Sequence, residues 1–426
     1  MTGLDGRHVE VAVVGGGQAG LALSWYLVRD GVDHVVLERD TVAHDWADRR
    51  WDAFTLVTPN WQCRLPGYPY EGPDPDGFMT RDEVHAWLRG YAASFGPPVH
   101  EGTTVTGVRE RPLGGFTVTT SAGTLTADQV VVATGGYHVP VLPAVSARLP
   151  ADVVQLHSAA YRSPDALPEG AVLVVGSGQS GAQIAEDLHL AGRRVHLALG
   201  RAPRCARRYR GRDCIAWLSD MGVYDVPVAA QAGGLAKRES TNHYMTGRGG
   251  GRDIDLRAFA REGMALHGRL TGAEGGVLTF APTAEASLDH ADAVMESIKD
   301  DIDRWIAAQG LDVPPEPRYT PVWRPDAERT ELDLVAAGVT SVVWAVGFRT
   351  DYRWVGVGVF DGTGHPTHHR GVTHVPGLLF LGLPWLHTWG SGRFEAVARD
   401  AEHLAAHLRR RAAGVPVADP FVGLAG

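Results

Sequence analysis

The feature that most constrains this chain is a glycine-rich turn that occurs twice. VAVVGGGQAG covers residues 11–20, and VLVVGSGQSG covers residues 172–181. In each copy a short apolar run leads into glycines spaced G-x-G-x-x-G, and a helical pattern follows. Strand, glycine turn and helix in this order are typical of the dinucleotide-binding βαβ unit. The repeat therefore predicts two such units in one chain.

The first copy has every part of this pattern. Gly15 is expected to make the tight turn, Gly17 to let the backbone approach a pyrophosphate, and Gly20 to let the helix pack against the strand. A second strand, residues 35–37, ends at Glu38, whose carboxylate can accept hydrogen bonds from a ribose. The N–H groups at the start of the helix attract phosphate. A glycine turn without a ligand is the alternative.

The second copy keeps Gly176, Gly178 and Gly181 but lacks the acid. A strand over residues 195–199 is followed by Arg201. A carboxylate there would repel the 2′-phosphate of NADPH, whereas a guanidinium can hold it, so we expect NADPH to be preferred over NADH. Two nicotinamide nucleotides gain nothing by exchanging a hydride. We therefore assign FAD to the first turn and NADPH to the second.

These elements predict an α/β fold class with two Rossmann-like dinucleotide-binding domains, for FAD and NADPH, the NADPH domain being inserted in the FAD domain. We expect the FAD domain to comprise residues 1–160 and 330–426, and the NADPH domain residues 161–329. A lid-like insertion is expected at about residues 205–325, with a solvated linker as the alternative. The four later arginines of this stretch, Arg207, Arg208, Arg210 and Arg212, are interpreted as a solvated basic face.

A last strand is expected at residues 378–381, followed by Gly382 and by a helix that starts near Ser391. The free N–H groups of that helix could stabilise negative charge on the flavin pyrimidine ring. Simple packing of the helix is the alternative.

Composition excludes several other classes of function. The net charge of −9 argues against general nucleic-acid binding. No apolar run approaches the ~18 residues that span a bilayer, so we expect a cytoplasmic protein without a membrane partner. The three cysteines form no CxxC pair, and the histidines His365, His368 and His369 lack Cys or Glu spacing, so we expect no metal site. A homodimer is left open.

Several segments carry a resemblance to a known family: GGGQAG, WDAFTLVTPNWQCRLPG, ATGGYHVPVLP, HSAAYR, GSGQSG and VPGLLFLGLPWLHT. They resemble the class B flavin monooxygenases, which include flavin-containing, YUCCA-type and N-hydroxylating enzymes. The whole chain is similar to a bacterial subfamily of flavin-dependent oxidoreductases often encoded beside nitrilase genes. The family fingerprint before the second turn is matched at His157 and Tyr161 but not at Ala151 and Val153. We expect His157 to be a structural residue between the domains.

The resemblance implies an activity. NADPH reduces FAD, O2 adds at flavin C4a, and the resulting peroxyflavin transfers one oxygen atom to a small organic substrate, which could contain nitrogen. The family places an amide near C4a, and Asn60 and Gln62 lie at about that place, so both are predicted catalytic residues. An amide that only caps local backbone is the alternative. The predicted cofactor-binding residues are Gly15, Gly17, Gln18, Gly20, Glu38, Arg39, Trp46, Arg50, Trp51, Thr134, Gly135, Gly176, Ser177, Gly178, Gln179, Ser180, Gly181, Arg201, Gly382 and Leu383.

Two other functions remain open at this point. One is an NADPH-dependent flavin reductase or oxidase, which passes electrons to a protein or to oxygen. The other is a flavin-binding regulator without turnover.

Overall fold

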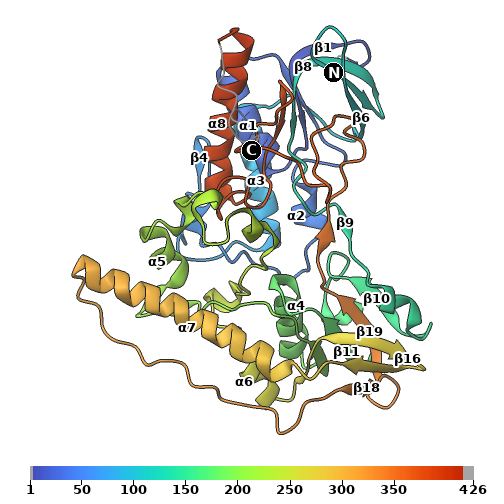
Figure 1. Cartoon of the computed structure of the whole chain (residues 1–426), viewed down its shortest axis with the longest axis vertical. Helices are drawn as coiled ribbons and strands as arrows, with labels where there is room; N and C mark the ends of the chain where they lie inside the picture. Colours follow the sequence, from blue (N-terminus) through green and yellow to red (C-terminus); the bar gives the residue numbers. More distant parts are fainter. Residues whose placement is uncertain (1–2, 416–426) are drawn as a thin grey trace.

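The computed structural model describes residues 3–415 and contains two main sheets, one above the other along the long axis in Figure 1. The first sheet has the order β5-β2-β1-β8-β7-β6, and β21 also pairs with β8. Its strands are β1 (His8–Val14), β2 (His34–Leu37), β5 (Val99–His100), β6 (Val105–Glu110), β7 (Phe116–Thr120), β8 (Gly123–Val132) and β21 (Leu378–Phe380). The pairs β1–β2, β1–β8 and β8–β21 are parallel, which aligns the carboxyl ends of these strands at one edge.

The second sheet is entirely parallel, with the order β10-β19-β11-β12-β15. Its strands are β10 (Val154–His157), β11 (Ala171–Val175), β12 (Val195–Ala198), β15 (Ala265–His267) and β19 (Val339–Trp344). The predicted range 161–329 therefore misses two strands of this sheet. The two strands are β10 and β19, which lie next to the segments where the chain passes from one sheet to the other. The sequence pattern of a single strand does not show to which sheet the strand belongs.

The chain crosses between the sheets twice, and the two crossings pair with each other. Strand β9 (Val139–Pro140) is antiparallel to β20 (Phe348–Arg349). Beside this ribbon, Nε2 of the buried His157 lies 3.0 Å from the carbonyl oxygen of Gly347. His157 thus has the structural role between domains that we expected.

Helices cover the sheets. In the upper part of Figure 1, α1 (Gln18–Arg29) and α8 (Phe394–Ala412) pack together over the first sheet in one apolar core. The other helices are α2 (His44–Asp48), α3 (Arg81–Phe95), α4 (Gln179–Leu190), α5 (Cys214–Asp220), α6 (Leu256–Arg261) and α7 (Ala284–Gln309). Short antiparallel strands complete the fold: β3 (Arg64–Leu65), β4 (Tyr68–Pro69), β13 (Arg208–Tyr209), β14 (Arg212–Asp213), β16 (Leu270–Glu274), β17 (Val277–Phe280) and β18 (Glu331–Asp333).

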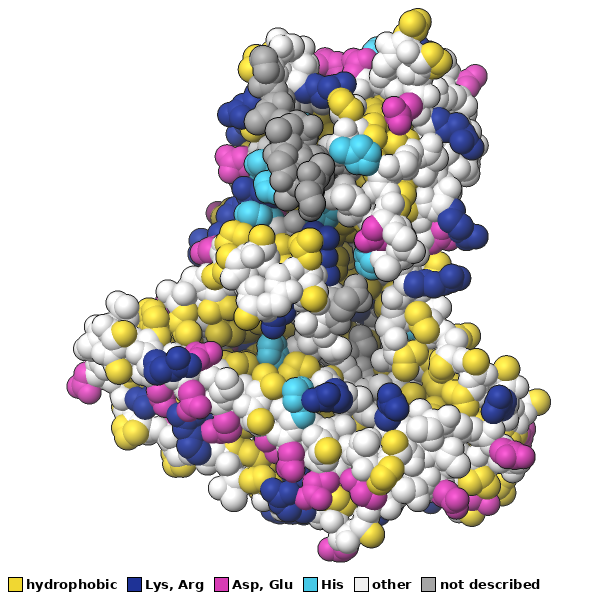
Figure 2. Space-filling model, viewed as in Figure 1, with side chains coloured by type: hydrophobic (Ala, Val, Ile, Leu, Met, Phe, Trp, Pro, Cys, Tyr) yellow, Lys and Arg dark blue, Asp and Glu magenta, His cyan; other side chains and the backbone are white. Residues whose placement is uncertain are grey.

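The predicted insertion at residues 205–325 is more than a loop. It contributes β15 to the second sheet, carries the long helix α7, and forms most of the three-stranded sheet β16-β17-β18. On the face shown in Figure 2, basic and acidic side chains are interspersed. Within residues 3–415, no helix has the length and apolar character that crossing a membrane requires.

Candidate functional site: two nucleotide-binding turns

The first turn connects β1 to α1, and its backbone requires glycine at two positions. Gly15 has φ +113°, and a Cβ atom added there would lie 2.6 Å from the carbonyl oxygen of Ala133, just past β8. A Cβ atom on Gly20 would overlap the carbonyl oxygen of Gly15. The turn is therefore pressed between α1 and the end of β8, as the glycine spacing predicted.

Gly17 differs, because a Cβ atom added there would meet nothing within 4 Å. Gly17 is also the N-cap of α1, and no side chain caps this helix. The first N–H groups of α1 therefore point into open space with the positive end of the helix dipole. A dinucleotide pyrophosphate fits this cradle, and a Cβ atom at Gly17 would intrude on it.

The side chains around the first turn are consistent with an FAD site. Arg50 is half-buried, stacks over the ring of Trp46 at 5.1 Å, and forms no ion pair within the described residues. Burial lowers the pKa of Arg50 because it disfavours the charged form of the guanidinium. A bound phosphate would stabilise that charged form. At the end of β2, Glu38 accepts hydrogen bonds from the N–H groups of Gly16 (2.6 Å) and Asp40 (2.9 Å). These two bonds fix the carboxylate and leave further lone pairs for a ribose.

The other residues predicted for FAD divide into two groups. Gly382, just past β21, lies against the turn, since a Cβ atom there would be 2.6 Å from the Cβ of Ala19. Thr134, Gly135 and the buried Leu383 likewise follow the carboxyl ends of β8 and β21. By contrast, Arg39 pairs with Asp40 at the surface, and Trp51 packs in the core of the second sheet. For Trp51 the structure favours a core role.

The second turn, between β11 and α4, repeats the first. Gly176 has φ +101°, and a Cβ atom there would lie 2.5 Å from the carbonyl oxygen of Ala345, just past β19. A Cβ atom on Gly181 would overlap the carbonyl oxygen of Gly176. Gly178 caps α4 without a side-chain bond, so the N–H groups of this helix are open as well. Ser180 lies in the first turn of α4.

Arg201 lies where the sequence predicted it, shortly after β12. Its side chain is exposed and forms no hydrogen bond or ion pair within residues 3–415. The neighbouring Gly200 is held to the turn, because its N–H donates to Oγ of Ser177 at 3.0 Å. The backbone next to Arg201 is therefore held beside the second turn, and its exposed guanidinium is free to bind an anion.

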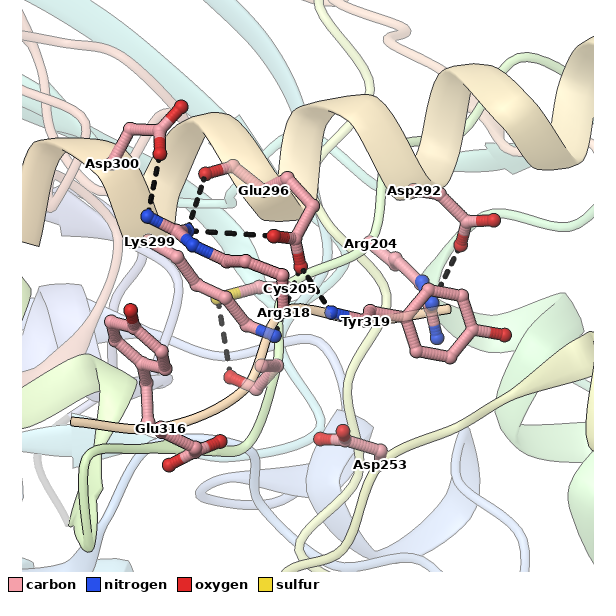
Figure 3. Close-up of polar contacts among 12 residues, drawn as sticks. Arg204, Cys205, Asp253, Asp292, Glu296, Lys299, Asp300, Glu316, Arg318 and Tyr319 are labelled. Atoms are coloured by element: carbon pink, nitrogen blue, oxygen red, sulfur yellow. Dashed lines mark hydrogen bonds and ion pairs between the residues drawn. The ribbon is translucent and has the colours of Figure 1, made fainter. Parts of the chain in front are cut away.

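The later arginines form a solvated basic face only in part: Arg208 is exposed, whereas Arg210 and Arg212 pair with Asp303 and Asp220. Arg204 and Arg207 are buried and pair with Asp292 (2.6 Å) and Asp213 (2.5 Å). Figure 3 shows the Arg204–Asp292 contact, and it shows Arg318 from a later segment reaching Asp300 on α7. These arginines hold the insertion together; the sequence interpretation failed because their acids lie 6 to 88 residues away in the chain, beyond any local pattern.

Two glutamines anchor the turns to distant segments. Gln18 donates to the carbonyl oxygen of Gly392 (3.2 Å) and accepts from Nε1 of Trp46 (3.0 Å). Gln179 donates to the carbonyl oxygen of Met245 (2.6 Å) and accepts from its N–H (3.2 Å). The first turn is thus attached to the segment before α8, and the second to the insertion.

Asn60 and Gln62 are buried residues of one 3-10 turn. The Asn60 amide donates to the carbonyl oxygen of Asp74 (2.9 Å) and accepts from the N–H of Met79 (2.8 Å). This is the capping alternative, and it occupies both ends of the amide. Gln62 is also buried, but its side chain forms no hydrogen bond within the described chain. The contacts therefore favour Gln62 over Asn60 as an amide available to a ligand.

The glycine-rich part of the insertion is clamped between the two domains. Arg248 pairs with Asp187 (2.6 Å) and Arg252 with Glu186 (2.7 Å), both buried acids of α4. On its other side, a Cβ atom on Gly247 would overlap the carbonyl oxygen of Leu56. These contacts hold residues 246–253 as a wedge between the two domains. A lid function for this wedge stays a prediction.

The segment just before α8 joins the two turns through the insertion. Trp389, shortly before α8, donates from Nε1 to Oδ1 of Asn242 in the insertion (3.0 Å). Thr241, next to Asn242, lies beside the second turn, its Cγ2 being 3.7 Å from a Cβ atom added to Gly178. With Gln18 bonded to Gly392, an unbroken path of contacts leads from one turn to the other. The WGSGR motif before α8 was the available signal.

Comparisons with known proteins agree with this arrangement. A family model described as pyridine nucleotide-disulphide oxidoreductase matches residues 12–219. A CzcO-like oxidoreductase of Geobacillus kaustophilus is 31% identical over 399 residues, which are 93% of this chain and 97% of the relative. The probable indole-3-pyruvate monooxygenase YUCCA4 of Arabidopsis thaliana is 34% identical over 178 residues, 41% of this chain and 43% of the relative. A flavin monooxygenase structure from Stenotrophomonas maltophilia covers 95% of this chain and 99% of its own with a TM-score of 0.67 at 20% identity, which shows a shared fold.

Proposed function

We infer that the chain, which belongs to the CzcO-like oxidoreductases of the class B flavin monooxygenase family, is an FAD-dependent monooxygenase. We propose that it uses NADPH and O2 to insert one oxygen atom into a small organic substrate. The observation that carries the proposal is the path of contacts between two open turns, from Gln18 and Gly392 to Trp389 and Asn242. Nucleotides bound at the two turns could extend their rings toward each other along this path, and hydride transfer requires the rings to meet.

The chain's own residues would divide the work as follows. The N–H groups of α1 and the unpaired Arg50 would hold the FAD pyrophosphate, with Glu38 at the ribose. The N–H groups of α4 and the exposed Arg201 would hold NADPH, Arg201 at the 2′-phosphate. When bound, the flavin would accept the hydride and activate oxygen. The wedge of residues 246–253 would limit access of water between the domains.

The experiment separates this proposal from its two rivals. The purified yellow protein is mixed with NADPH without oxygen, then with oxygen and a panel of amines, sulfides and ketones, while product and H2O2 are measured per NADPH consumed. Bleaching by NADPH and substrate-dependent product support a monooxygenase. Prompt, complete release of H2O2 with every substrate would indicate the oxidase, and no bleaching would indicate the regulator.

A matched pair of variants tests whether Asn60 or Gln62 is a catalytic amide. Asn60→Ala removes two hydrogen bonds to the backbone and should lower the free energy of unfolding by about 1–3 kcal/mol. Gln62→Ala removes none, so its cost in stability should be limited to the lost packing of one buried side chain. If Gln62 serves the oxygen reaction, its variant releases more H2O2 per NADPH while FAD content is unchanged; unchanged coupling in both variants would remove both residues from the mechanism.

We also propose a cytoplasmic location. All three cysteines, Cys63, Cys205 and Cys214, are free thiols in the structure, as expected in a reducing compartment. A homodimer stays open to measurement by light scattering.

A further inference from the structure

One arginine beside the path between the turns has surroundings that nucleotide binding does not explain. Arg393 is the N-cap residue of α8 and is half-buried. Its guanidinium lies 4.6 Å from the ring centre of Trp389 and 5.3 Å from that of Tyr224. It forms no ion pair with any residue between 3 and 415, in contrast to the buried Arg207 and Arg257, which both bind carboxylates.

The electrostatic setting makes the missing partner costly. The N-terminus of a helix carries partial positive charge, so a cation is disfavoured there unless an anion joins it. Lys237 and His243 come from the insertion to the same place: burial, together with the nearby charges of Arg393 and Lys237, lowers the pKa of His243 to about 4. The histidine is therefore neutral, and two unpaired cations remain.

Two buried hydroxyl groups at the same place also lack partners. Tyr224 and Thr388 are 7% and 6% exposed, and neither the phenol oxygen nor Oγ1 forms a hydrogen bond. Both residues border Gly390, since a Cβ atom there would lie 3.5 Å from the main-chain oxygen of Tyr224 and from Oγ1 of Thr388. Burial raises the pKa of Tyr224 to about 12, although the Arg393 guanidinium beside the phenol oxygen acts to lower it, so the phenol stays protonated and its O–H remains a donor. A buried donor without an acceptor costs free energy until a ligand supplies one.

We propose that these groups form the anion subsite of the substrate site and bind the carboxylate of an organic acid. The forked guanidinium of Arg393 would take the two carboxylate oxygens, and the hydroxyls of Tyr224 and Thr388 would complete the set of donors. The rings of Trp389 and Tyr224 hold the guanidinium plane and exclude water, which strengthens the ion pair. The name "substrate site" rests on the proposed function, because the cluster lies between the two nucleotide-binding turns.

The experiment is calorimetric titration of the FAD-loaded protein with benzoate and with benzamide, which has nearly the same shape without the charge. We expect the wild type to bind benzoate roughly ten- to hundredfold more tightly, the size of one charge-assisted contact. Arg393→Met should reduce this preference to about twofold or less, and Arg393→Lys should keep part of it because the charge stays but the fork is lost. Arg399→Met, on the same helix but paired with Asp225, is the matched control and should retain the full preference.

Four results would overturn the inference. They are a wild type without preference for benzoate, an Arg393→Met variant with the full preference, loss of FAD from that variant, and weakening of NADP⁺ binding by the same factor as benzoate. The last two would assign Arg393 to a cofactor. Arg393→Lys keeps the test decisive if the Met variant does not fold. Since titration needs no turnover, a protein that prefers benzoate through Arg393 but never forms an oxygenated product would retain the subsite and contradict the proposed function.

Discussion

The two glycine turns have the same backbone and different surroundings. In both, the first glycine has positive φ and abuts the residue that follows a neighbouring parallel strand, Ala133 or Ala345. In both, the last glycine lies against the carbonyl oxygen of the first. The glycines thus solve one steric problem twice, and they carry no information about which nucleotide binds.

The differences begin at the end of the following strand. The first turn has the fixed carboxylate of Glu38, and the second has the unpaired guanidinium of Arg201. Ligand choice in such a pair therefore depends on a residue some 20 positions after the turn, where the ribose of a bound nucleotide would lie. The comparison teaches that shape and selectivity are encoded separately, and each can be tested without the other.

The largest effect should come from the glycines that contact backbone. Gly20→Ala and Gly181→Ala each force a methyl group onto a carbonyl oxygen, so the free energy of unfolding should fall by about 3 kcal/mol or more. Urea unfolding and flavin absorbance are the measurements. Gly20→Ala should purify without FAD, whereas Gly181→Ala should keep FAD and lose reduction by NADPH; loss of FAD from both variants would break the assignment of one nucleotide to each turn.

The open glycines should separate binding from stability. Gly17→Ala meets no protein atom, so the free energy of unfolding should change by about 1 kcal/mol or less while most FAD is lost. Gly178→Ala is the counterpart, and it should raise the KM for NADPH without loss of FAD. Full flavin occupancy in purified Gly17→Ala would contradict the pyrophosphate cradle.

Cofactor choice should depend on Arg201. Arg201→Ala should raise the KM for NADPH roughly ten- to hundredfold, since one charge-assisted contact is worth about 1.5–3 kcal/mol, and should leave NADH nearly unchanged. Arg208→Ala, which removes another exposed arginine of the same run, is the control and should change neither value. Equal effects of Arg201→Ala on both nucleotides would show that the residue does not contact the 2′-phosphate.

The smallest effects should come from the glutamines. Gln18→Ala and Gln179→Ala each remove two hydrogen bonds, at about 0.5–1.5 kcal/mol per bond. If only one of the two bonds is lost in effect, at about 0.5–1.5 kcal/mol, hydrogen exchange should become about two- to tenfold faster before α8 in the first variant and around Met245 in the second. Faster exchange at the same segment in both variants would mean that the two turns are coupled more tightly than their separate anchors suggest.

The fold class was predictable from the sequence because its signals are local. The prediction of an α/β fold with two Rossmann-like units and the resemblance to the class B flavin monooxygenases are confirmed, whereas a gene neighbourhood beside nitrilases stays a prediction. Strand β21 was predicted within one residue, because an apolar run ending in glycine suffices to define it. Helix α8 begins at Phe394 rather than near Ser391, since the WGSGR turn precedes it.

What the sequence could not provide were partners distant along the chain. Nothing local distinguishes the buried Arg204 from an exposed arginine, because Asp292 completes the pair only after folding. In the same way, β10 and β19 join the inserted sheet through pairing with each other and with β11. Arg393 differs from Arg204, because no described residue of the chain forms an ion pair with it and the proposed partner is a ligand.

The late return of β21 has a consequence for synthesis. Its residues Leu378–Phe380 pair with Val130–Val132 of β8, so about 250 residues must be synthesised between the two strands. At ~5–20 residues per second a ribosome needs about 12–50 s for that stretch. The inserted unit can complete its five strands in this interval, while the apolar edge of β8 waits uncovered and open to pairing with another nascent chain. The yield of folded protein should therefore depend on the speed of translation through the inserted unit.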